Sequence, residues 1–300
     1  MTEFLLAHLS DAHIGPLPQF LRRELMNKRL TGYMNWKRRA QIHDMDVLAA
    51  LVADMKAQAP DHVAMTGDVM NIGLPGEFPV ARAWLETLGD PRHVSFTPGN
   101  HDAYVRATLP WIEQTFAPWC SSDGEAHTRF PFLRLRGEVA LIGLSSGVPT
   151  APFLASGRLG LEQREALAAL LDETGKRGLM RVVMIHHPPT RGGAGFGRGL
   201  TDARQFEAVL ARHGAELVLH GHNHRLQVRH VDRSEAAKIP CVGVASCSAV
   251  PGTPLHRAAY HLYRITRAGN GWSVEARARG MAAESSAGAL HVRDLGPVAL

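Results

Sequence analysis

Cysteine is scarce in this chain of 300 residues, which contains only Cys120, Cys241 and Cys247. The number is odd and no pair has the CxxC spacing, so neither a disulfide framework nor a thiolate zinc site is expected. Reduced thiols in the cytoplasm are the simplest interpretation, and we therefore expect a cytoplasmic protein.

Long apolar runs are also missing, so the sequence predicts no transmembrane helix. The apolar stretch at the start, MTEFLLAHLSD, is too short for a signal peptide. Charged residues make up 20% of the chain and the net charge is +5, which is typical of an ordinary globular protein. A mildly basic chain suits an anionic substrate, nucleic acid or a membrane surface equally well. Charge alone therefore does not choose among these partners.

Short apolar runs, often rich in β-branched residues, alternate with helical patterns over most of the chain. Such runs are typical of buried strands, and they occupy residues 4–9, 62–66, 93–97, 139–144, 181–185 and 216–219. Apolar residues recur at helical spacing over 42–55, 161–173 and 202–213. The alternation predicts a layered α/β domain. Further strands are expected at 239–245, 260–266 and 272–279, so that residues 1–280 form one catalytic domain and 281–300 a loosely held tail.

Polar side chains follow five of these runs directly. The sequences are Asp11-Ala12-His13, Asp68 to Asn71, Asn100-His101-Asp102, His186-His187 and His222-Asn223-His224. The carboxyl ends of strands are where ligand sites form in an α/β sheet, so we expect these side chains to share one crevice. Their oxygen and nitrogen donors suit manganese, iron or zinc.

The number of donors exceeds what one tetrahedral metal ion needs. Seven groups fit two ions if one carboxylate bridges them, and Asp68 is the residue expected to do so. Two ions about 3.5–4 Å apart activate a water and hold a phosphoryl group for in-line displacement. The candidate ligands are Asp11, His13, Asp68, Asn100, His186, His222 and His224.

The motifs DAH, GDVMN, GNHD, HHPP and GHNH, in this order, resemble the calcineurin-like metallophosphoesterase superfamily over residues 5 to 225. The resemblance implies a four-layer α/β/β/α sandwich of two mixed β-sheets with a binuclear metal centre. It implies that His101 stabilises the transition state or protonates the leaving oxygen, and that Asp102 orients His101. It divides the ligands into Asp11, His13, Asp68 and His224 for one ion and Asp68, Asn100, His186 and His222 for the other.

Within that superfamily the chain resembles the class III cyclic nucleotide phosphodiesterases and the glycerophosphodiesterases. The hypothesis is therefore a phosphodiesterase that uses a metal-bridging hydroxide on a cyclic nucleotide, a glycerophosphodiester or a phospholipid-like substrate. Asn71, where that group frequently has an acid, and His187 are candidates for substrate binding, and packing is the alternative for His187. Other hypotheses are a lipid–nucleotide pyrophosphatase of the UDP-diacylglucosamine type, a phosphomonoesterase, or a non-catalytic protein that binds membrane or nucleic acid.

Residues 21–39 fit this scheme least well, because seven basic residues and one acid are interleaved there with apolar side chains. The pattern predicts a basic amphipathic helix that is interrupted near Gly32. It could cover the edge of a sheet, close over an anionic substrate, or contact an anionic membrane surface. The glycine-rich residues 191–199 form either a flexible loop or one that shapes the substrate site. Nucleic acid is not expected as a partner, and the sequence does not indicate an oligomeric state.

Overall fold

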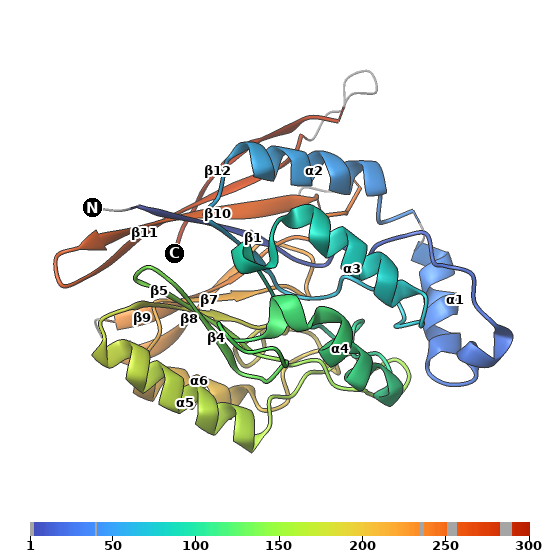
Figure 1. Cartoon of the computed structure of the whole chain (residues 1–300), viewed down its shortest axis with the longest axis horizontal. Coiled ribbons are helices and arrows are strands. Elements are labelled where there is room, and N and C mark those ends of the chain that lie inside the picture. Colours follow the sequence, from blue (N-terminus) through green and yellow to red (C-terminus); the bar gives the residue numbers. More distant parts are fainter. Residues whose placement is uncertain (1–2, 40, 235–236, 251–256, 283–289) are drawn as a thin grey trace.

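Two six-stranded sheets lie face to face, and helices cover the outer face of each (Figure 1). The computed structural model describes residues 3–39, 41–234, 237–250, 257–282 and 290–300. The strand orders are β12-β11-β10-β1-β2-β3 in the first sheet and β4-β5-β6-β7-β9-β8 in the second. This arrangement confirms the expected four-layer α/β/β/α sandwich.

The first sheet combines three parallel strands with three antiparallel ones. Strands β1 (Phe4–Leu9), β2 (His62–Met65) and β3 (Val94–Phe96) are parallel, while β10 (Ala259–Ala268), β11 (Gly271–Met281) and β12 (Val292–Val298) continue the sheet in antiparallel pairs. Successive side chains of a strand point to opposite faces. Ala7 and Leu9 of β1 accordingly pack against the helices, and Leu6 packs between the two sheets.

Three helices cover the outer face of the first sheet. They are α2 (Met45–Ala57), α3 (Glu77–Leu88) and α4 (Leu109–Cys120), the last preceded by a short 3₁₀ turn, η3 (Arg106–Thr108). Another 3₁₀ turn, η2 (Pro91–His93), leads into β3. The helices contribute Leu51, Leu85 and Phe116 to the largest buried apolar cluster, which fixes them on the sheet.

The second sheet repeats this construction on the other side of the molecule. Its strands are β4 (Phe132–Arg136), β5 (Val139–Gly143), β6 (Met180–Met184), β7 (Leu217–His220), β8 (Gln227–Ser234) and β9 (Ala237–Gly243). Strands β5, β6, β7 and β9 are parallel. Helices α5 (Leu161–Lys176) and α6 (Ala203–His213) cover the outer face through Leu171, Phe206 and Leu210.

The C-terminal residues differ from expectation. Residues 292–298 were predicted to belong to a loose tail, but they form β12, which pairs with β11 and buries Val298 between the sheets.

The basic segment, residues 21–39, also differs from expectation. It forms a 3₁₀ turn, η1 (Arg22–Leu25), and a helix, α1 (Arg29–Arg39), which continues through Gly32. A Cβ at Gly32 would lie 2.2 Å from the Tyr104 hydroxyl, so glycine allows close packing here instead of interrupting the helix. Among the described residues, no helix has the length and apolarity required to cross a bilayer.

The buried guanidinium of Arg134 joins the edges of the two sheets. Arg134 belongs to β4, and its Nη1 donates to the carbonyl oxygen of Val94 in β3 over 2.7 Å. Its other hydrogen bonds reach the carbonyl oxygens of Ser121 (2.8 Å), Pro91 (2.6 Å) and Pro118 (2.7 Å). One side chain therefore satisfies four backbone acceptors where strand, turn and helix meet.

We expect Arg134→Met to lower the free energy of unfolding by about 3 kcal/mol, because it leaves several buried carbonyl groups without a donor. Urea denaturation followed by circular dichroism measures this change. Arg129→Met, at an exposed position in the preceding loop, is the matched control and should stay within about 0.5 kcal/mol of the unaltered protein. Equal stability of the two variants would contradict the role given to Arg134.

Candidate metal centre

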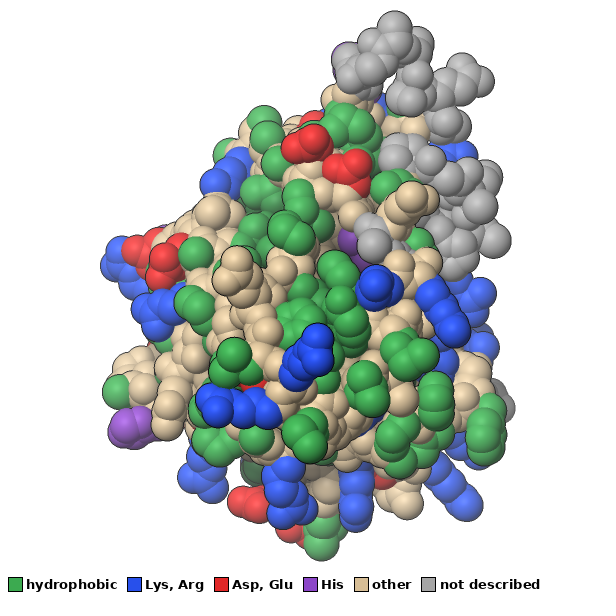
Figure 2. All heavy atoms as spheres, turned by 90° about the vertical axis from the view of Figure 1, so that its right-hand side faces the viewer, with side chains coloured by type: hydrophobic (Ala, Val, Ile, Leu, Met, Phe, Trp, Pro, Cys, Tyr) green, Lys and Arg blue, Asp and Glu red, His purple; other side chains and the backbone are tan. Residues whose placement is uncertain are grey.

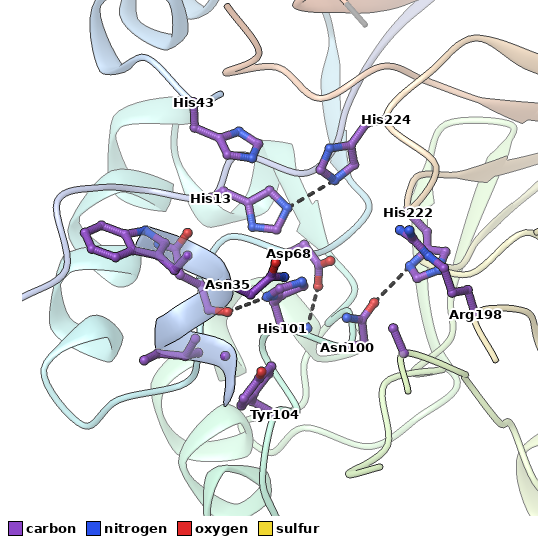
Figure 3. Close-up of a pocket in the computed structure, with 15 residues that line it drawn as sticks. His13, Asn35, His43, Asp68, Asn100, His101, Tyr104, Arg198, His222 and His224 are labelled. Carbon is purple, nitrogen blue, oxygen red and sulfur yellow. Dashed lines mark hydrogen bonds between the residues drawn. The ribbon is translucent and has the colours of Figure 1, made fainter. Parts of the chain in front are cut away.

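The carboxyl ends of five parallel strands meet at one side of the sandwich, and the residues that follow them line one cavity (Figure 3). Asp11 and His13 follow β1, Asp68 follows β2, and Asn100 follows β3. The second sheet supplies the histidines that follow β6 and β7. The structure brings all seven predicted ligands together, in two neighbouring groups.

The first group consists of Asp11, His13 and His224. The Nε2 atom of His224 lies 3.1 Å from Asp11 Oδ1 and 3.2 Å from the Nε2 atom of His13. His13 Nε2 is 3.9 Å from the same carboxylate oxygen. Asp11 and His13 are buried, so two imidazole nitrogens and one carboxylate oxygen converge on a point that water hardly reaches.

The second group consists of Asp68, Asn100, His186 and His222. The Nε2 atom of His186 lies 3.1 Å from Asp68 Oδ2 and 3.3 Å from Asn100 Oδ1. The Nδ1 atom of His222 is 2.9 Å from that same amide oxygen and 3.3 Å from His186 Nε2. All four side chains are buried.

Asp68 stands between the two groups. One of its oxygens, Oδ2, faces His186 of the second group, and Oδ1 accepts a hydrogen bond of 2.8 Å from the backbone N–H of His101. Ligand atoms of Asp68, His13 and His101 also lie within 4.8 Å of one another. This position matches the bridging role that the sequence predicts for Asp68.

Most of these groups have the protonation state that metal binding requires, which is neutral for an imidazole and ionised for a carboxylate. Burial, reinforced by neighbouring histidines, holds the pKa of His13 and of His222 well below its usual range, so both rings are neutral. Burial alone would raise the pKa of Asp68, but His186 and His101 outweigh it and hold that pKa well below its usual range. Asp11 Oδ1 is buried without a hydrogen bond among the described residues, an arrangement that a cation would satisfy.

His186 is the exception, because its ring lies 3.1 Å from the Asp68 carboxylate. Burial acts to lower the pKa of His186, but the carboxylate of Asp68 outweighs burial and raises this pKa to about 9. A cation bound beside Asp68 would displace the proton that this raised pKa favours on His186.

The backbone at the predicted ligands is unusual. Seven described residues other than glycine have positive φ, and five of them are predicted ligands: Asp11, His13, Asp68, His222 and His224, with φ between 42° and 70°. Residues with side chains rarely adopt this left-handed conformation, and such strain concentrates at functional sites. The strain supports a shared functional role for these five positions.

Comparison with known proteins agrees with this geometry. The family model for calcineurin-like phosphoesterases matches residues 4–226. The chain belongs to this family. Its clustered His and Asp side chains are donors that could hold metal ions.

Two curated relatives carry phosphodiesterase names. A probable cyclic nucleotide phosphodiesterase of Synechococcus sp. is 32% identical over 180 residues, which cover 59% of this chain and 63% of that protein. A glycerophosphodiester phosphodiesterase of Enterobacter lignolyticus is 25% identical over 254 residues, 79% of this chain and 76% of that protein. The chain thus matches less than two thirds of the length of the first of these relatives.

Solved structures share the fold at low sequence identity. A dimetal phosphatase from Danio rerio has a TM-score of 0.55 and 13% identity, with 98% of each chain covered. A purple acid phosphatase from Lupinus luteus has a TM-score of 0.56 and 11% identity, with 97% of this chain and 53% of that chain covered. At these identities the likeness establishes the sandwich architecture alone.

His101 lines the cavity between the two ligand groups. Its Nδ1 atom makes a short contact with the carbonyl oxygen of Asn71, which only accepts hydrogen bonds, so Nδ1 carries a proton. The Nε2 atom is therefore the one left to act on a bound molecule. The catalytic role of His101 stays a prediction that this geometry supports.

Asp102 does not take the role that the resemblance implies. It was expected to orient His101, but its carboxylate accepts hydrogen bonds from four backbone N–H groups, those of Asp68 (2.8 Å), Val69 (3.1 Å), Met70 (3.1 Å) and Gly99 (2.8 Å). Burial, followed by the charge of Asp68, raises the pKa of Asp102 to about 7, while these donors favour its ionised form. Asp102 therefore holds the loop that presents Asp68, and the carbonyl of Asn71 orients His101.

The hydrogen bonds of His187 favour packing over the expected substrate contact, which stays a prediction. Its Nδ1 lies 2.8 Å from Ser146 Oγ and its Nε2 lies 3.1 Å from the carbonyl oxygen of Ala155, so both ring nitrogens are engaged by the protein. Burial lowers the pKa of His187 to about 3, which keeps the ring neutral. Asn71 lines the cavity, but its amide donates to the carbonyl oxygen of Ile14 over 2.7 Å. Substrate binding by Asn71 stays a prediction.

His43 and Arg198 also line the cavity, although neither was named as a candidate site residue from the sequence. The ring of His43 lies 4.6 Å from that of His13 and 5.6 Å from that of His224, measured between centroids. Its Nδ1 lies 2.7 Å from Ser248 Oγ. Arg198, in the glycine-rich loop, lines the cavity beside His222 (Figure 3). His43 lies just before α2, away from any strand end, so no motif marked it.

The glycines of the motifs allow close packing against the predicted ligands as well as sharp turns. Gly67 has a φ of +97°, which suits the predicted turn, and a Cβ at this position would lie 2.5 Å from His186 Nδ1. A Cβ at Gly99 would lie 2.2 Å from Asp68 Oδ1. The loop after β3 can therefore approach Asp68 only if residue 99 has no side chain.

We expect Gly99→Ala to displace Asp68 and to weaken metal affinity by about 10-fold to 100-fold, the usual consequence of disturbing the support of a ligand. Calorimetric titration with Mn²⁺ measures the affinity. Gly271→Ala is the matched control, because the nearest atom to its new Cβ lies 3.9 Å away. An unchanged affinity in Gly99→Ala would show that the packing around Asp68 does not set its position.

Proposed function

We propose that the protein is a phosphodiesterase that uses two metal ions, manganese, iron or zinc, to hydrolyse small phosphodiesters. The observation that carries this proposal is the position of Asp68 between two groups of converging nitrogen and oxygen donors. Asp11, His13 and His224 would hold one ion with Asp68. Asn100, His186 and His222 would hold the other with the same carboxylate.

The donor set suits these metals. Carboxylate, amide oxygen and imidazole are the available groups, and all three cysteines are buried, with burial raising the pKa of each thiol above its usual range. Such donors favour manganese, iron or zinc. When bound, a pair of ions of this kind activates water as the nucleophile and stabilises the charge that develops on the phosphoryl group.

His101 supplies the remaining acid–base group. With Nδ1 held by the carbonyl oxygen of Asn71, a second proton can reside on Nε2, on the side of the cavity. Burial lowers the pKa of His101, although the charge of Asp68 opposes this effect. A lowered pKa makes an imidazolium a better proton donor, which suits protonation of a leaving alkoxide.

Two observations favour a diester over a monoester. The two curated relatives carry the names of phosphodiesterases. A cleft of about 530 Å³ also runs from Asn100 and His101 toward α1, and this size can hold a substituent on the phosphate. Both relatives' substrate classes, cyclic nucleotides and glycerophosphodiesters, are candidates for this chain.

A metal-loaded assay tests the proposal. Protein stripped of metal and then supplied with Mn²⁺, Fe²⁺ or Zn²⁺ should hydrolyse bis(p-nitrophenyl) phosphate faster than p-nitrophenyl phosphate. The stripped protein should be inactive until metal returns. Faster hydrolysis of the monoester would make the protein a phosphomonoesterase, and inactivity on both with two ions bound would exclude the proposed function.

We expect His101→Ala to retain two metal ions per chain and to lose about 100-fold to 10,000-fold in kcat, as removal of a general acid does. Elemental analysis and the diester assay measure the two quantities. His127→Ala, at an exposed position, should change neither. Asn100→Ala should instead lose both activity and metal, since Asn100 is a predicted ligand. A loss of metal in His101→Ala would make His101 a ligand.

A further inference from the structure

The cleft beside the metal centre is walled by segments that are far apart in the sequence. Helix α1 forms one side, residues 153–155 form another, and Arg198 closes the end nearest the metal ligands. Asn100 and His101 lie on its floor, so the cleft is continuous with the cavity that they also line. A substituent of a phosphodiester held at the metal centre would extend into this cleft.

Specific contacts fix α1 in place. The buried guanidinium of Arg29 donates from Nε to the carbonyl oxygen of Ile72 over 3.3 Å and also contacts that of Gly73. The ammonium of Lys28 donates to Thr150 Oγ1 over 2.5 Å and to the carbonyl oxygen of Leu154 over 3.0 Å. Helix α1 is thereby joined both to the loop after β2 and to the opposite wall of the cleft.

Apolar side chains stand out into solvent on the segments that wall this cleft. Leu30 and Met34 lie four residues apart on α1, which places them along one side of the helix, and each is 51% exposed. Met26, in the turn before α1, is 83% exposed. Phe153 and Phe196 are 88% and 104% exposed. Their loops lie side by side, because the N–H of Ala155 donates to the carbonyl oxygen of Gly197 over 2.9 Å.

The backbone conformation of Phe153 is also unusual. Its φ is 68°, in the left-handed region, which is rare for a bulky residue. The ring is at the same time largely removed from contact with the protein. A conformation that costs free energy and exposes an aromatic ring is expected where that ring has a binding role.

The charges of the same region are almost all positive. Residues 21–39 carry seven basic residues and one acid, Glu24, whose carboxylate accepts the N–H of Leu21 over 2.7 Å. Residues 145–160 and 188–201 contain no Asp or Glu and three arginines. Figure 2, which views the side of the molecule that carries α1, shows hydrophobic and basic side chains interspersed, with few acidic ones near its centre.

We propose that this surface, called here the α1 face and defined by Arg22, Arg23, Met26, Leu30, Phe153 and Phe196, docks on an anionic lipid bilayer. The phosphodiester substrate then reaches the metal centre from that bilayer, with its apolar substituent in the cleft. The inference rests on the proposed function and narrows its substrate to a lipid phosphodiester. Basic side chains bind the anionic headgroups, and the apolar tips enter the boundary between headgroups and acyl chains.

The distribution of apolar residues favours a bilayer over a protein partner. Stable protein interfaces have a contiguous apolar core from which charged residues are depleted. On the α1 face, basic side chains lie between the apolar tips, an arrangement typical of interfacial membrane binding. The face also adjoins the cleft, because Phe153 lines the cleft and Phe196 lies two residues before Arg198, which lines it too.

Co-sedimentation with vesicles tests the docking. The full-length, metal-loaded protein should bind vesicles of phosphatidylcholine mixed with phosphatidylglycerol and should bind pure phosphatidylcholine at least tenfold more weakly. Salt should weaken the binding, because it screens the attraction between charges. Absence of binding to either vesicle, or equal binding to both, would overturn the proposal.

Paired variants separate the two contributions. Arg22→Glu with Arg23→Glu should reduce vesicle binding at least tenfold, whereas Lys176→Glu with Arg212→Glu, on α5 and α6 at a distance from α1, should not (Figure 1). Leu30→Gln with Phe196→Ser should reduce it as well, while Leu295→Gln, on β12 and 40% exposed, is the apolar control. Equal effects of test and control variants would contradict a specific face.

The substrate is tested separately from the docking. The protein should release the headgroup from a phosphatidylglycerol diester in mixed micelles, and the Leu30→Gln, Phe196→Ser variant should lose this activity at least tenfold more than activity on bis(p-nitrophenyl) phosphate. Hydrolysis of the soluble diester without any of the lipid diester would overturn this inference and leave the proposed function intact. Failure on both substrates would overturn the proposed function itself.

Discussion

The carboxylate of Asp68, buried between two groups of imidazole and oxygen donors, is the charge that the rest of the site must balance. His186 lies 3.1 Å from this carboxylate, which, against the effect of burial, raises the pKa of His186 to about 9. Two cations would neutralise Asp68 and Asp11 together and would use the lone pairs of the neutral rings. Bound metal ions would therefore stabilise the arrangement of converging donors.

The architecture makes this concentration of donors possible. Parallel strands of two sheets end at the same side, so loops from both sheets meet there, while the apolar layers behind them supply the stability. Positive φ at five predicted ligands costs conformational free energy, and so does a glycine at position 99. The stability of the rigid strands offsets both costs. Asp102 fixes the backbone of the Asp68 loop with four hydrogen bonds, and Arg134 holds the edges of the two sheets together.

The sequence predicted those parts of the site that follow a strand directly. Asp11, Asp68 and Asn100 were found because an apolar run ends just before each of them, and the strands themselves lie where the patterns placed them. His43 was not found, because its position beside His13 depends on the tertiary placement of the segment before α2. His187 and Asp102 have suitable chemistry, but their hydrogen-bond partners are set by tertiary packing. Strand β12 was also missed, because the composition of its residues does not indicate a strand and it forms by pairing with β11.

The central proposal is that the carboxylate of Asp68 bridges two metal ions. Electron paramagnetic resonance of the protein loaded with two equivalents of Mn²⁺ tests it most directly, because ions about 3.5–4 Å apart and bridged by a carboxylate couple magnetically. The proposal predicts the spectrum of a coupled pair, which Asp68→Ala should abolish. The spectrum of isolated, uncoupled Mn²⁺ at full loading of the unaltered protein would contradict the account.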